Sequence, residues 1–284
     1  MRNPITKADR QFSVMGLPLH LLDDYSGWLF DQLHQQLGCH VVTLNAEMTM
    51  QAEQNSALAE IIHHAELVIP DGAGIVFYLR LYGKRVARCP GIELAESILK
   101  KVALFNLEQR DISPSENSPQ TPHRVSTIES SSTPAVSVFF FGGAPEVAQT
   151  AADRWQKRLP GLAIVGVQNG YLSAEEEPAF LEMLQMQQPQ IMFVGLGVPR
   201  QELWIAQHRH LCPKALWIGV GGSFDIWAGT KTRAPGWLRD NHLEWVYRLY
   251  QEPWRWRRMM ALPQFAGRSI LYRLTKRNPI STRF

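Results

Sequence analysis

Cysteine is scarce in this chain of 284 residues, which has only Cys39, Cys89 and Cys212, an odd number without C-x-x-C spacing. A disulfide framework and a cysteine-based zinc site are therefore disfavoured, and the composition suits a reducing cytosol. Long apolar runs are also missing. Pro18 and Asp23 help to interrupt the candidates near the N-terminus, and no later run approaches the roughly 20 apolar residues that span a bilayer. We expect neither a secretory leader nor a membrane-spanning helix.

Several nucleotide and metal motifs are absent as well. The chain has no G-x-G-x-x-G fingerprint, no P-loop lysine, no D-x-D pair and no His/Cys cluster with metal spacing. We therefore expect no metal and no cofactor. A dinucleotide-dependent oxidoreductase or epimerase acting on nucleotide sugars is kept as the alternative function, with the missing glycine fingerprint against it.

Charge is distributed unevenly along the sequence. The net charge of +3 combines residues 231–284, with 12 Lys/Arg against 3 Asp/Glu, and residues 1–230, with 17 against 23. With 45% hydrophobic and 19% charged residues, the whole chain has a globular composition. A basic segment on an acidic body predicts a partner that carries phosphate, whether a membrane, a nucleic acid or a phosphorylated ligand.

Short apolar runs rich in β-branched and aromatic residues alternate with helical patterns along residues 41–230. We expect buried strands at 41–44, 67–70, 136–141, 163–167, 191–196 and 215–220. A further short strand over 12–22 should lead to a helix over roughly 24–37. Strand followed by helix, repeated, predicts an α/β fold: a Rossmann-like, mostly parallel sheet with flanking helices.

Two segments depart from this alternation. Residues 106–134 are rich in Ser, Thr, Asn and Pro, which predicts an exposed, disordered insertion within a core of residues 1–230. Residues 231–284, hereafter the appendage, interleave tryptophan with arginine on two helical patterns that we expect to break near Pro253 and Pro263. We predict a separate basic, helical unit.

Polar residues follow the first two expected strands of the sheet, where ligands of open α/β sheets bind. Thr43 and Asn45 flank one strand end; either could cap the next helix or contact a ligand. Asp71, between Pro70 and two nearby glycines, could likewise be an N-cap or a general base with a pKa raised by burial.

Glycine-bearing turns follow three later strands. They contain Gly142 and Gly143, Gly197 with Gln201, and Gly222 with Asp225. A glycine turn entering a helix suits phosphate. Together these turns favour a nucleotide crevice, although each alone would be weak. Arg88, in a basic loop before another helix, is by itself typical of solvated surface.

In their order along the chain, five segments resemble a known family. They are TLNAEMTMQA, LVIPDGAGIV, FFFGGAPEVA, VGLGVPRQELW and IGVGGSFDIWAGTKTRAPGWLRDNHLEWVYRLYQEPWRWRR. The chain is similar, over roughly residues 13–105 and 136–262, to the bacterial N-acetylmannosaminyltransferases typified by TagA, WecG and CpsF. Arg200 and Glu93 stand where that family usually has lysine and aspartate, and both keep the charge.

The resemblance implies an inverting, metal-independent glycosyltransferase. It would move a sugar from a UDP-sugar to an undecaprenyl-diphosphate-linked sugar, in the synthesis of a surface polysaccharide or wall polymer. The donor sugar implied is N-acetylmannosamine or a related hexose or hexuronate. The protein would be cytoplasmic and peripheral on the inner face of the cytoplasmic membrane.

The resemblance also implies roles for individual residues. Asp71 would be the base, with Thr43 and Asn45 near the sugars, and with Arg88 and Gln201 as further catalytic-site residues. Asp225 matches a position associated with the uracil. Three appendage residues would neutralise the leaving diphosphate; they are Arg248, Arg255 and Arg258.

The interleaved tryptophans and arginines of the appendage also fit an interfacial helix on anionic lipid. Packing of the tryptophans on the body is the alternative, more so for Trp245 than for Trp254 and Trp256. We expect no nucleic-acid partner, because the body is acidic and carries no nucleic-acid motif. The oligomeric state stays open, a homo-oligomer included.

Overall fold

A computed structural model describes residues 11–112 and 135–275 of the chain. Six strands form one sheet in the order β4-β3-β8-β7-β5-β6, and all five neighbouring pairs are parallel. The strands are β3 (Cys39–Leu44), β4 (Leu67–Pro70), β5 (Ser137–Gly142), β6 (Ala163–Gln168), β7 (Ile191–Gly195) and β8 (Leu216–Gly219). The expected parallel α/β fold is confirmed, with its six sheet strands close to their predicted positions.

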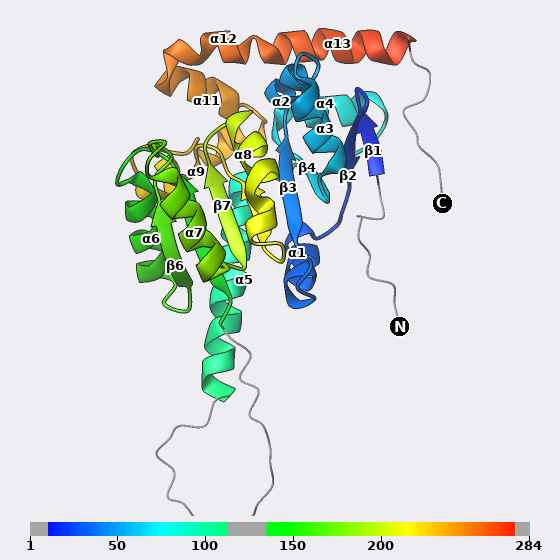
Figure 1. Cartoon of the computed structure of the whole chain (residues 1–284). Helices are drawn as coiled ribbons and strands as arrows, with labels where there is room; N and C mark the ends of the chain where they lie inside the picture. The colour runs from blue at the N-terminus through cyan, green and yellow to red at the C-terminus, as the bar shows by residue number, and fades with distance from the viewer. Residues whose placement is uncertain (1–10, 113–134, 276–284) are drawn as a thin grey trace, which may run out of the picture.

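Helices cover both faces of this sheet (Figure 1). One face packs against α1 (Tyr25–His34), α5 (Gly91–Ile112), α6 (Val147–Arg158) and α9 (Ser223–Ala228). The other packs against α2 (Ala46–Ala52), α3 (Ser56–His64), α4 (Gly72–Leu81), α7 (Glu177–Gln187) and α8 (Arg200–His208). The side-chain period of a strand explains the split: Val41 belongs to the first core and its neighbour Val42 to the second.

The edge strand β6 differs from the buried strand expected at 163–167. None of its residues is buried, and Val165 is exposed. β6 has a sheet neighbour only on the β5 side, whereas the other edge strand, β4, is also contacted by β2 and is fully buried. Apolar composition identified the strand but not its place at the rim.

The N-terminal strand expected over 12–22 is a hairpin instead of one strand. β1 (Gln11–Val14) and β2 (Leu17–His20) pair antiparallel. They are joined by Met15 and Gly16, both with positive φ (51° and 97°). That is the turn that a two-residue hairpin requires. The helix that follows, α1, begins after Asp24, whose side chain accepts from the Gly27 backbone N–H at 2.9 Å.

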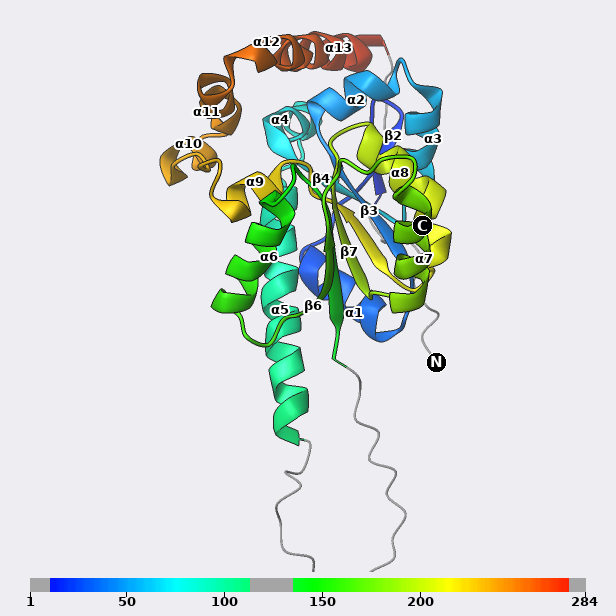
Figure 2. The same ribbon diagram turned by 60° about the vertical axis from the view of Figure 1, so that its left-hand side comes forward.

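The sequence predicts an insertion that starts at residue 106, but in the structure the preceding helix continues to residue 112. Residues 106–112 complete α5, which extends beyond the lower end of the sheet (Figure 2). Asn106 is fully buried; its amide donates to the Val136 and Gly161 carbonyls, and its oxygen accepts from the Val136 N–H. A polar composition hid a helix because Asn106 satisfies buried backbone groups. The remainder, 113–134, lies outside the described residues.

The appendage forms four helices in its described part, 231–275. They are α10 (Gly236–Asp240), α11 (Glu244–Gln251), α12 (Trp256–Met259) and α13 (Ala261–Thr275). The break near Pro253 is confirmed by a 3-10 turn, Pro253–Arg255. The break near Pro263 is found at Met260, between α12 and α13, and Pro263 itself lies in the first turn of α13, where backbone N–H groups have no helical partner.

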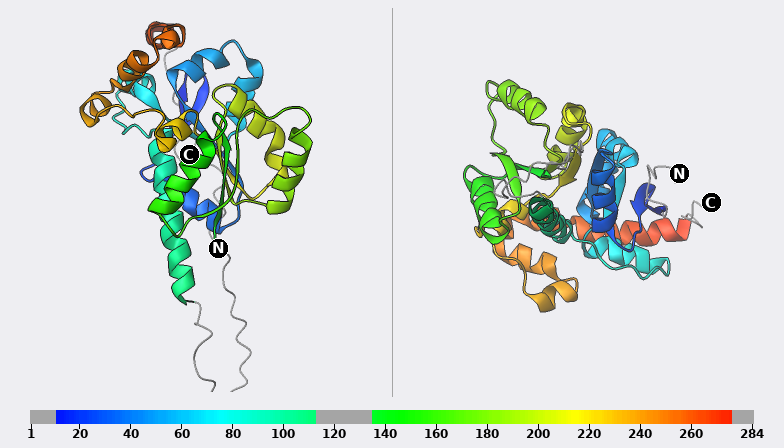
Figure 3. Two further views of the ribbon diagram at one scale, coloured as in Figure 1. Left: turned by 90° about the vertical axis from the view of Figure 1, so that its left-hand side faces the viewer. Right: turned by 90° about the horizontal axis from the view of Figure 1, so that it is seen from below.

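The last helix of the appendage lies against α2 and α4, across the end of the sheet where the strands finish (Figures 1 and 3). Phe265 anchors it. This ring is fully buried and packs 6.1 Å from the ring of Tyr78, centroid to centroid. The appendage therefore shares a hydrophobic core with the body.

Candidate active site

A cavity of about 140 Å³ lies where the carboxyl ends of β3 and β4 face the appendage. We call it the Asp71 cavity. Its walls come from both parts of the chain. The body supplies Asn45, Ala46, Glu47, Asp71, Gly72, Ala73, Gly74 and Arg88, and the appendage supplies His242, Glu244, Trp245, Arg248, Arg258, Met259, Ala261 and Leu262.

Asp71 is held at the cavity wall by its backbone. It occupies the N-cap position of α4, yet its carboxylate makes no capping hydrogen bond. Its own N–H donates to the Leu44 carbonyl at 2.9 Å, and the next residue, Gly72, has a φ of +80°. A side chain at that φ would be strained, so glycine lets the chain turn into α4 while the carboxylate stays at the cavity. Of the two interpretations of Asp71, side-chain capping is thus wrong.

The environment of Asp71 suits a general base. Burial raises the pKa of its carboxyl to about 6, against the opposing effects of Arg248 and Arg88. A carboxylate with a pKa near 6 is ionised at neutral pH and is a stronger base than an ordinary aspartate.

Asn45 and Thr43 have different places. Asn45 caps α2, since its side-chain oxygen accepts from the Met48 N–H at 2.9 Å, and it also lines the Asp71 cavity. Thr43 is buried in β3 and does not line that cavity. A Cβ at Gly91 would lie 2.7 Å from the Thr43 methyl group, so Thr43 packs tightly against the start of α5. Thr43 thus has a packing role. Asn45 both caps α2 and lines the Asp71 cavity, so capping and ligand contact are compatible for it.

A second cavity, of about 50 Å³, adjoins the first, and Glu244 and Arg248 line both. We call it the Lys231 cavity. Its wall includes Gly222, Lys231 and Arg255. Lys231 bridges the carboxylates of Asp225, at 2.9 Å, and Glu252, at 3.2 Å.

Gln201 supports the glycine turn that follows β8, at residues 219–222, through a hydrogen bond to its backbone. It is buried, and its side-chain oxygen accepts from the Gly221 N–H at 3.1 Å. Its amide donates to Glu202 at 2.8 Å. A Cβ at Gly219 would lie 2.5 Å from the Gln201 amide nitrogen, so only glycine fits there. Gln201 thus shapes the turn that carries Gly222, and it lines neither cavity.

The other glycine turns lie at the ends of β5 and β7. Gly142 pairs with Gly195, and a Cβ on Gly142 would lie 2.4 Å from the Gly195 carbonyl oxygen. The Gly143 N–H donates to the same oxygen at 3.1 Å. Close backbone packing therefore explains Gly142, and a φ of +72° explains Gly143. Gly197, with a φ of +75°, would place a Cβ in open space.

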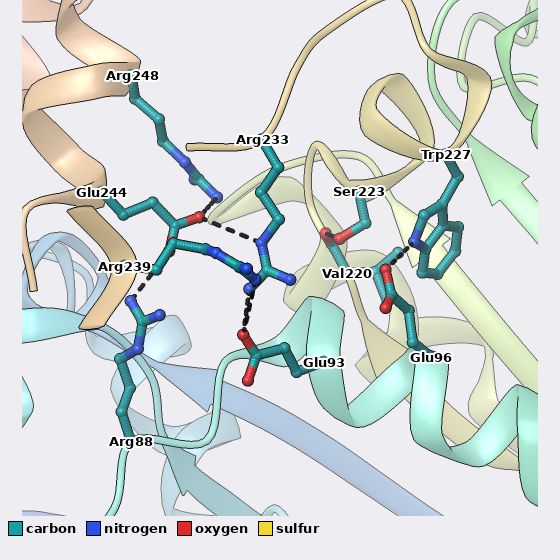
Figure 4. A network of polar contacts seen from close by, with 10 residues as sticks. All are labelled: Arg88, Glu93, Glu96, Val220, Ser223, Trp227, Arg233, Arg239, Glu244 and Arg248. Carbon is teal, nitrogen blue, oxygen red and sulfur yellow. Dashed lines mark hydrogen bonds and ion pairs between the residues drawn. The ribbon is translucent and has the colours of Figure 1, made fainter. Parts of the chain in front are cut away.

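Arginines link the appendage to the body around both cavities (Figure 4). Arg88 donates to Glu244 at 3.0 Å, and Arg248 donates to the other oxygen of that carboxylate at 3.4 Å. Arg258 donates to Glu47 at 2.7 Å. Arg255, in contrast, pairs at 2.7 Å with Glu252 of the appendage itself.

Comparison with protein families identifies the chain. The model of the glycosyl transferase WecG/TagA/CpsF family matches residues 12–108 and 114–279. This chain belongs to the WecG/TagA/CpsF family of glycosyltransferases. The resemblance inferred from the five sequence segments is confirmed, as is the expectation of a glycosyltransferase.

Three curated relatives carry one common name, N-acetylglucosaminyldiphosphoundecaprenol N-acetyl-beta-D-mannosaminyltransferase. The relative from Bacillus spizizenii is 34% identical over 82% of this chain and 79% of its own length. Those from Bacillus subtilis and Staphylococcus aureus (strain MW2) are 29% and 30% identical, over 82% and 83% of this chain and 80% and 79% of their own. The family match and these relatives give no support to the alternative of a dinucleotide-dependent oxidoreductase or epimerase.

In this family member, the Asp71 cavity gathers five of the sequence-predicted site residues. They are Asn45, Asp71, Arg88, Arg248 and Arg258. Among the wall residues that sequence reasoning missed are His242, Glu244 and Trp245 of the appendage. All three lie in the segment DNHLEWVYR. In the sequence, an acidic residue that lines a cavity looks the same as a solvated acidic residue at the start of a helix. Among residues 11–112 and 135–275, no three His, Cys, Asp or Glu side chains are grouped as they would be to hold a metal ion.

Proposed function

We propose that this protein transfers a sugar from a UDP-sugar to an undecaprenyl-diphosphate-linked sugar, with inversion and without a metal. The names of the relatives support N-acetylmannosamine as the sugar transferred and N-acetylglucosamine as the acceptor sugar. A related hexose or hexuronate donor stays within the proposal. The product would enter a surface polysaccharide or wall polymer.

In the proposed reaction, Asp71 takes the proton of the acceptor hydroxyl as that oxygen attacks the anomeric carbon of the donor. The new glycosidic bond forms on the face opposite the departing UDP, which inverts the anomeric centre. The bond from the anomeric carbon to the phosphate oxygen breaks, and its electron pair leaves with the diphosphate. Arg88 and Arg248 stabilise that growing negative charge, which guanidinium groups do well in a desolvated site.

Donor contacts follow from the places of the remaining residues. We assign the diphosphate to the region that Arg248 shares between the two cavities, with Arg255 and Arg258 on either side of it. The uracil would lie near Asp225 and the Gly222 turn, whose shape Gln201 maintains. Thr43 would act indirectly, by positioning the start of α5 near Asp71.

One observation carries the proposal: a carboxyl with a pKa of about 6 lies in a cavity that arginines from two distant parts of the chain complete. The test is Asp71→Asn, assayed for UDP release from UDP-N-acetylmannosamine with a short-chain polyprenyl-diphosphate-N-acetylglucosamine acceptor. We expect turnover to fall at least about a thousandfold while UDP binding changes little. Asp24→Asn, which keeps a capping residue on α1, is the matched control. Near wild-type turnover of Asp71→Asn would refute the base.

The pH profile gives a second test of the same base. The wild-type kcat/KM should fall as the pH drops below about 6, because a protonated Asp71 cannot accept the acceptor proton. A rate that stays constant down to pH 5 would contradict this assignment.

We further propose that the appendage places the protein on the inner face of the cytoplasmic membrane. No helix in the described parts of the chain has both the length and the apolar character to span a bilayer. The appendage exposes large aromatic side chains instead: Tyr250 is 82% exposed and Trp254 71%, near Arg257 and Arg258. This mixture fits binding to anionic lipid.

Vesicle sedimentation tests this location. The double variant Trp254→Ser, Trp256→Ser should bind phosphatidylglycerol vesicles at least about tenfold more weakly than wild type, and raised salt should weaken the binding of both proteins. Met186→Ser, on α7 and equally exposed, is the control. If the double variant sediments with vesicles like wild type, this surface is not the membrane contact.

A further inference from the structure

Glu244, the first residue of α11, is a buried carboxylate that no sequence motif indicated. Its side chain is 11% exposed, as is that of Arg88, its partner from the body. Arg233 approaches the same carboxylate, Nε to Oε1, at 3.9 Å. Glu244 therefore has arginine neighbours from the body, from the start of the appendage and from its own helix (Figure 4).

The charges around Glu244 do not balance. Arg233 also pairs with a second carboxylate, that of Glu93, and Arg239 pairs with Glu93 as well. Four guanidinium groups therefore surround the carboxylates of Glu244 and Glu93. These six groups leave two positive charges, or one when Asp71, on which Arg88 and Arg248 also act, is ionised. Such an excess suits a diphosphate, but guanidinium groups gathered around the same carboxylates repel one another. A carboxylate between them is what lets them share one wall.

The position of Glu244 makes this balance relevant to the reaction. It lines both cavities, and its two oxygens bind Arg88 and Arg248, the two arginines that also act on Asp71. We infer that Glu244 is a positioning residue, which joins Arg88 of the body to Arg248 of the appendage and so sets both guanidinium groups for the departing diphosphate. This inference rests on the proposed function, because it assigns Glu244 a part in that same reaction.

The ionisation of Glu244 agrees with this role. Burial would raise the pKa of Glu244, but Arg248, Arg88 and Arg233 outweigh that effect and hold it below its ordinary value. The carboxylate is thus charged over the whole range in which Asp71 titrates. Its charge also favours a protonated Asp71, opposing the two arginines.

Two other titratable groups lie near Asp71. Burial raises the pKa of the neighbouring Cys89 thiol to about 12, so the thiol is uncharged near pH 6. Burial together with Arg80 and Arg88 lowers the pKa of His242, which disfavours its charged form. Glu47 and Arg258, also at the cavity, are paired with each other. Removal of the Glu244 charge thus leaves Arg88 and Arg248 as the uncompensated charges nearest to Asp71.

The experiment compares Glu244→Gln, which keeps the size and removes the charge, with wild type in the UDP-release assay. We expect kcat to fall about tenfold to a hundredfold, because Arg88 and Arg248 lose their common partner. The acid limb of kcat/KM should move to lower pH, because the arginines then act on Asp71 without opposition. Glu244→Asp, which retains the charge, should recover part of kcat and return the acid limb towards pH 6.

A purely structural role predicts something else, and hydrogen exchange of residues 261–275 separates the two. Phe265 and the Arg258–Glu47 pair hold this helix independently of Glu244, so its protection should stay at the wild-type level in Glu244→Gln. Glu53→Gln is the matched control. It removes another pair between body and appendage, Arg268 to Glu53 at 3.8 Å, outside both cavities.

Two results would overturn the inference. One is a Glu244→Gln enzyme with wild-type kcat and an unchanged acid limb. The other is joint loss of activity and of protection over 261–275 in Glu244→Gln, which would make Glu244 a docking contact only. Asp71→Asn in the same assay separates this failure from that of the proposed function: if Asp71→Asn is active, the reaction itself is wrongly assigned.

Discussion

The two walls of the Asp71 cavity are built in different ways. On the body side, backbone contacts at the ends of β3 and β4 fix the reactive group: Asp71 donates its N–H to Leu44, and Asn45 caps α2. On the appendage side, side-chain contacts dominate, such as the pairs of Arg248 with Glu244 and of Arg258 with Glu47. The proposed base thus belongs to the sheet, whereas the appendage arginines depend on how the appendage docks.

The largest effect should come from the apolar anchor of the appendage wall. Phe265→Ala should lower the free energy of unfolding by about 3–5 kcal/mol, because it removes a fully buried ring. Chemical denaturation measures this loss. Ile270→Ala, on the same helix but half exposed, should cost far less. Equal losses in the two variants would mean that the appendage does not depend on this anchor.

Removal of one appendage cation should cost less than removal of the anchor, and it should affect turnover more than folding. We expect Arg248→Gln to lower kcat about a hundredfold, and Arg248→Lys to retain more activity because it keeps the charge without the planar fork. Steady-state kinetics of UDP release measures both. Arg268→Gln, which removes an arginine outside the cavities, should leave kcat unchanged. A similar kcat for Arg248→Gln and Arg268→Gln would show that an arginine on the cavity wall contributes no more to turnover than one outside it.

On the body wall, Asp71, the proposed base, should reduce stability at neutral pH. The folded pKa of Asp71, about 6, exceeds the ordinary value of 3.8, so the folded state binds the proton more tightly than the unfolded state. This contribution is fully present below pH 3.8 and is lost as the pH rises through 6. Asp71→Asn, which stays neutral, should therefore gain about 2–3 kcal/mol over wild type as the pH rises from 4 to 8.

Denaturation at the two pH values tests this prediction, and Asp24, followed below pH 4, supplies a control of opposite sign. A hydrogen bond from the Gly27 backbone N–H, followed by one from Ser26, lowers the pKa of Asp24. Asp24→Asn should thus lose stability relative to wild type as the pH rises through the titration range of that carboxyl. If Asp71→Asn gains nothing between pH 4 and pH 8, the carboxyl does not have the raised pKa on which the base assignment depends.

The smallest effect separates the two roles of Asn45. Asn45→Ala removes the cap of α2 and should cost about 1 kcal/mol, whereas Asn45→Ser keeps a capping oxygen and should cost only a few tenths. If the amide also contacts a sugar, both variants should share the same loss of kcat/KM. Thermal denaturation and kinetics on the pair give the two answers. Wild-type kcat/KM in Asn45→Ser would leave capping as its only role.

The sheet could be predicted because each buried strand carries its own apolar run. The runs at 67–70 and 191–196 were enough to locate β4 and β7. Residues whose role depends on distant partners could not be placed in this way. Asn106 stands in a polar stretch, yet its partners are backbone groups of Val136 and Gly161, 30 and 55 residues away.

The site residues also divide into those that the local sequence predicts and those whose role depends on distant partners. Asp71 was predictable because it directly follows a strand, where parallel sheets bind ligands. Glu244 was not, because its meaning depends on Arg88, 156 residues away in the chain. The resemblance to the family supplied Arg248 and Arg258, since the charge of the appendage alone could not say which of its arginines face the body.

The division of the cavity between early and late parts of the chain affects how the enzyme matures. During synthesis the chain leaves the ribosome from its N-terminus, and domains generally fold as units. The strand ends that hold Asp71 leave the ribosome well before the segment from His242 to Leu262 that closes the cavity. A nascent chain thus carries an unfinished pocket that lacks its late arginines, and competence for transfer begins only when translation has delivered the last helix.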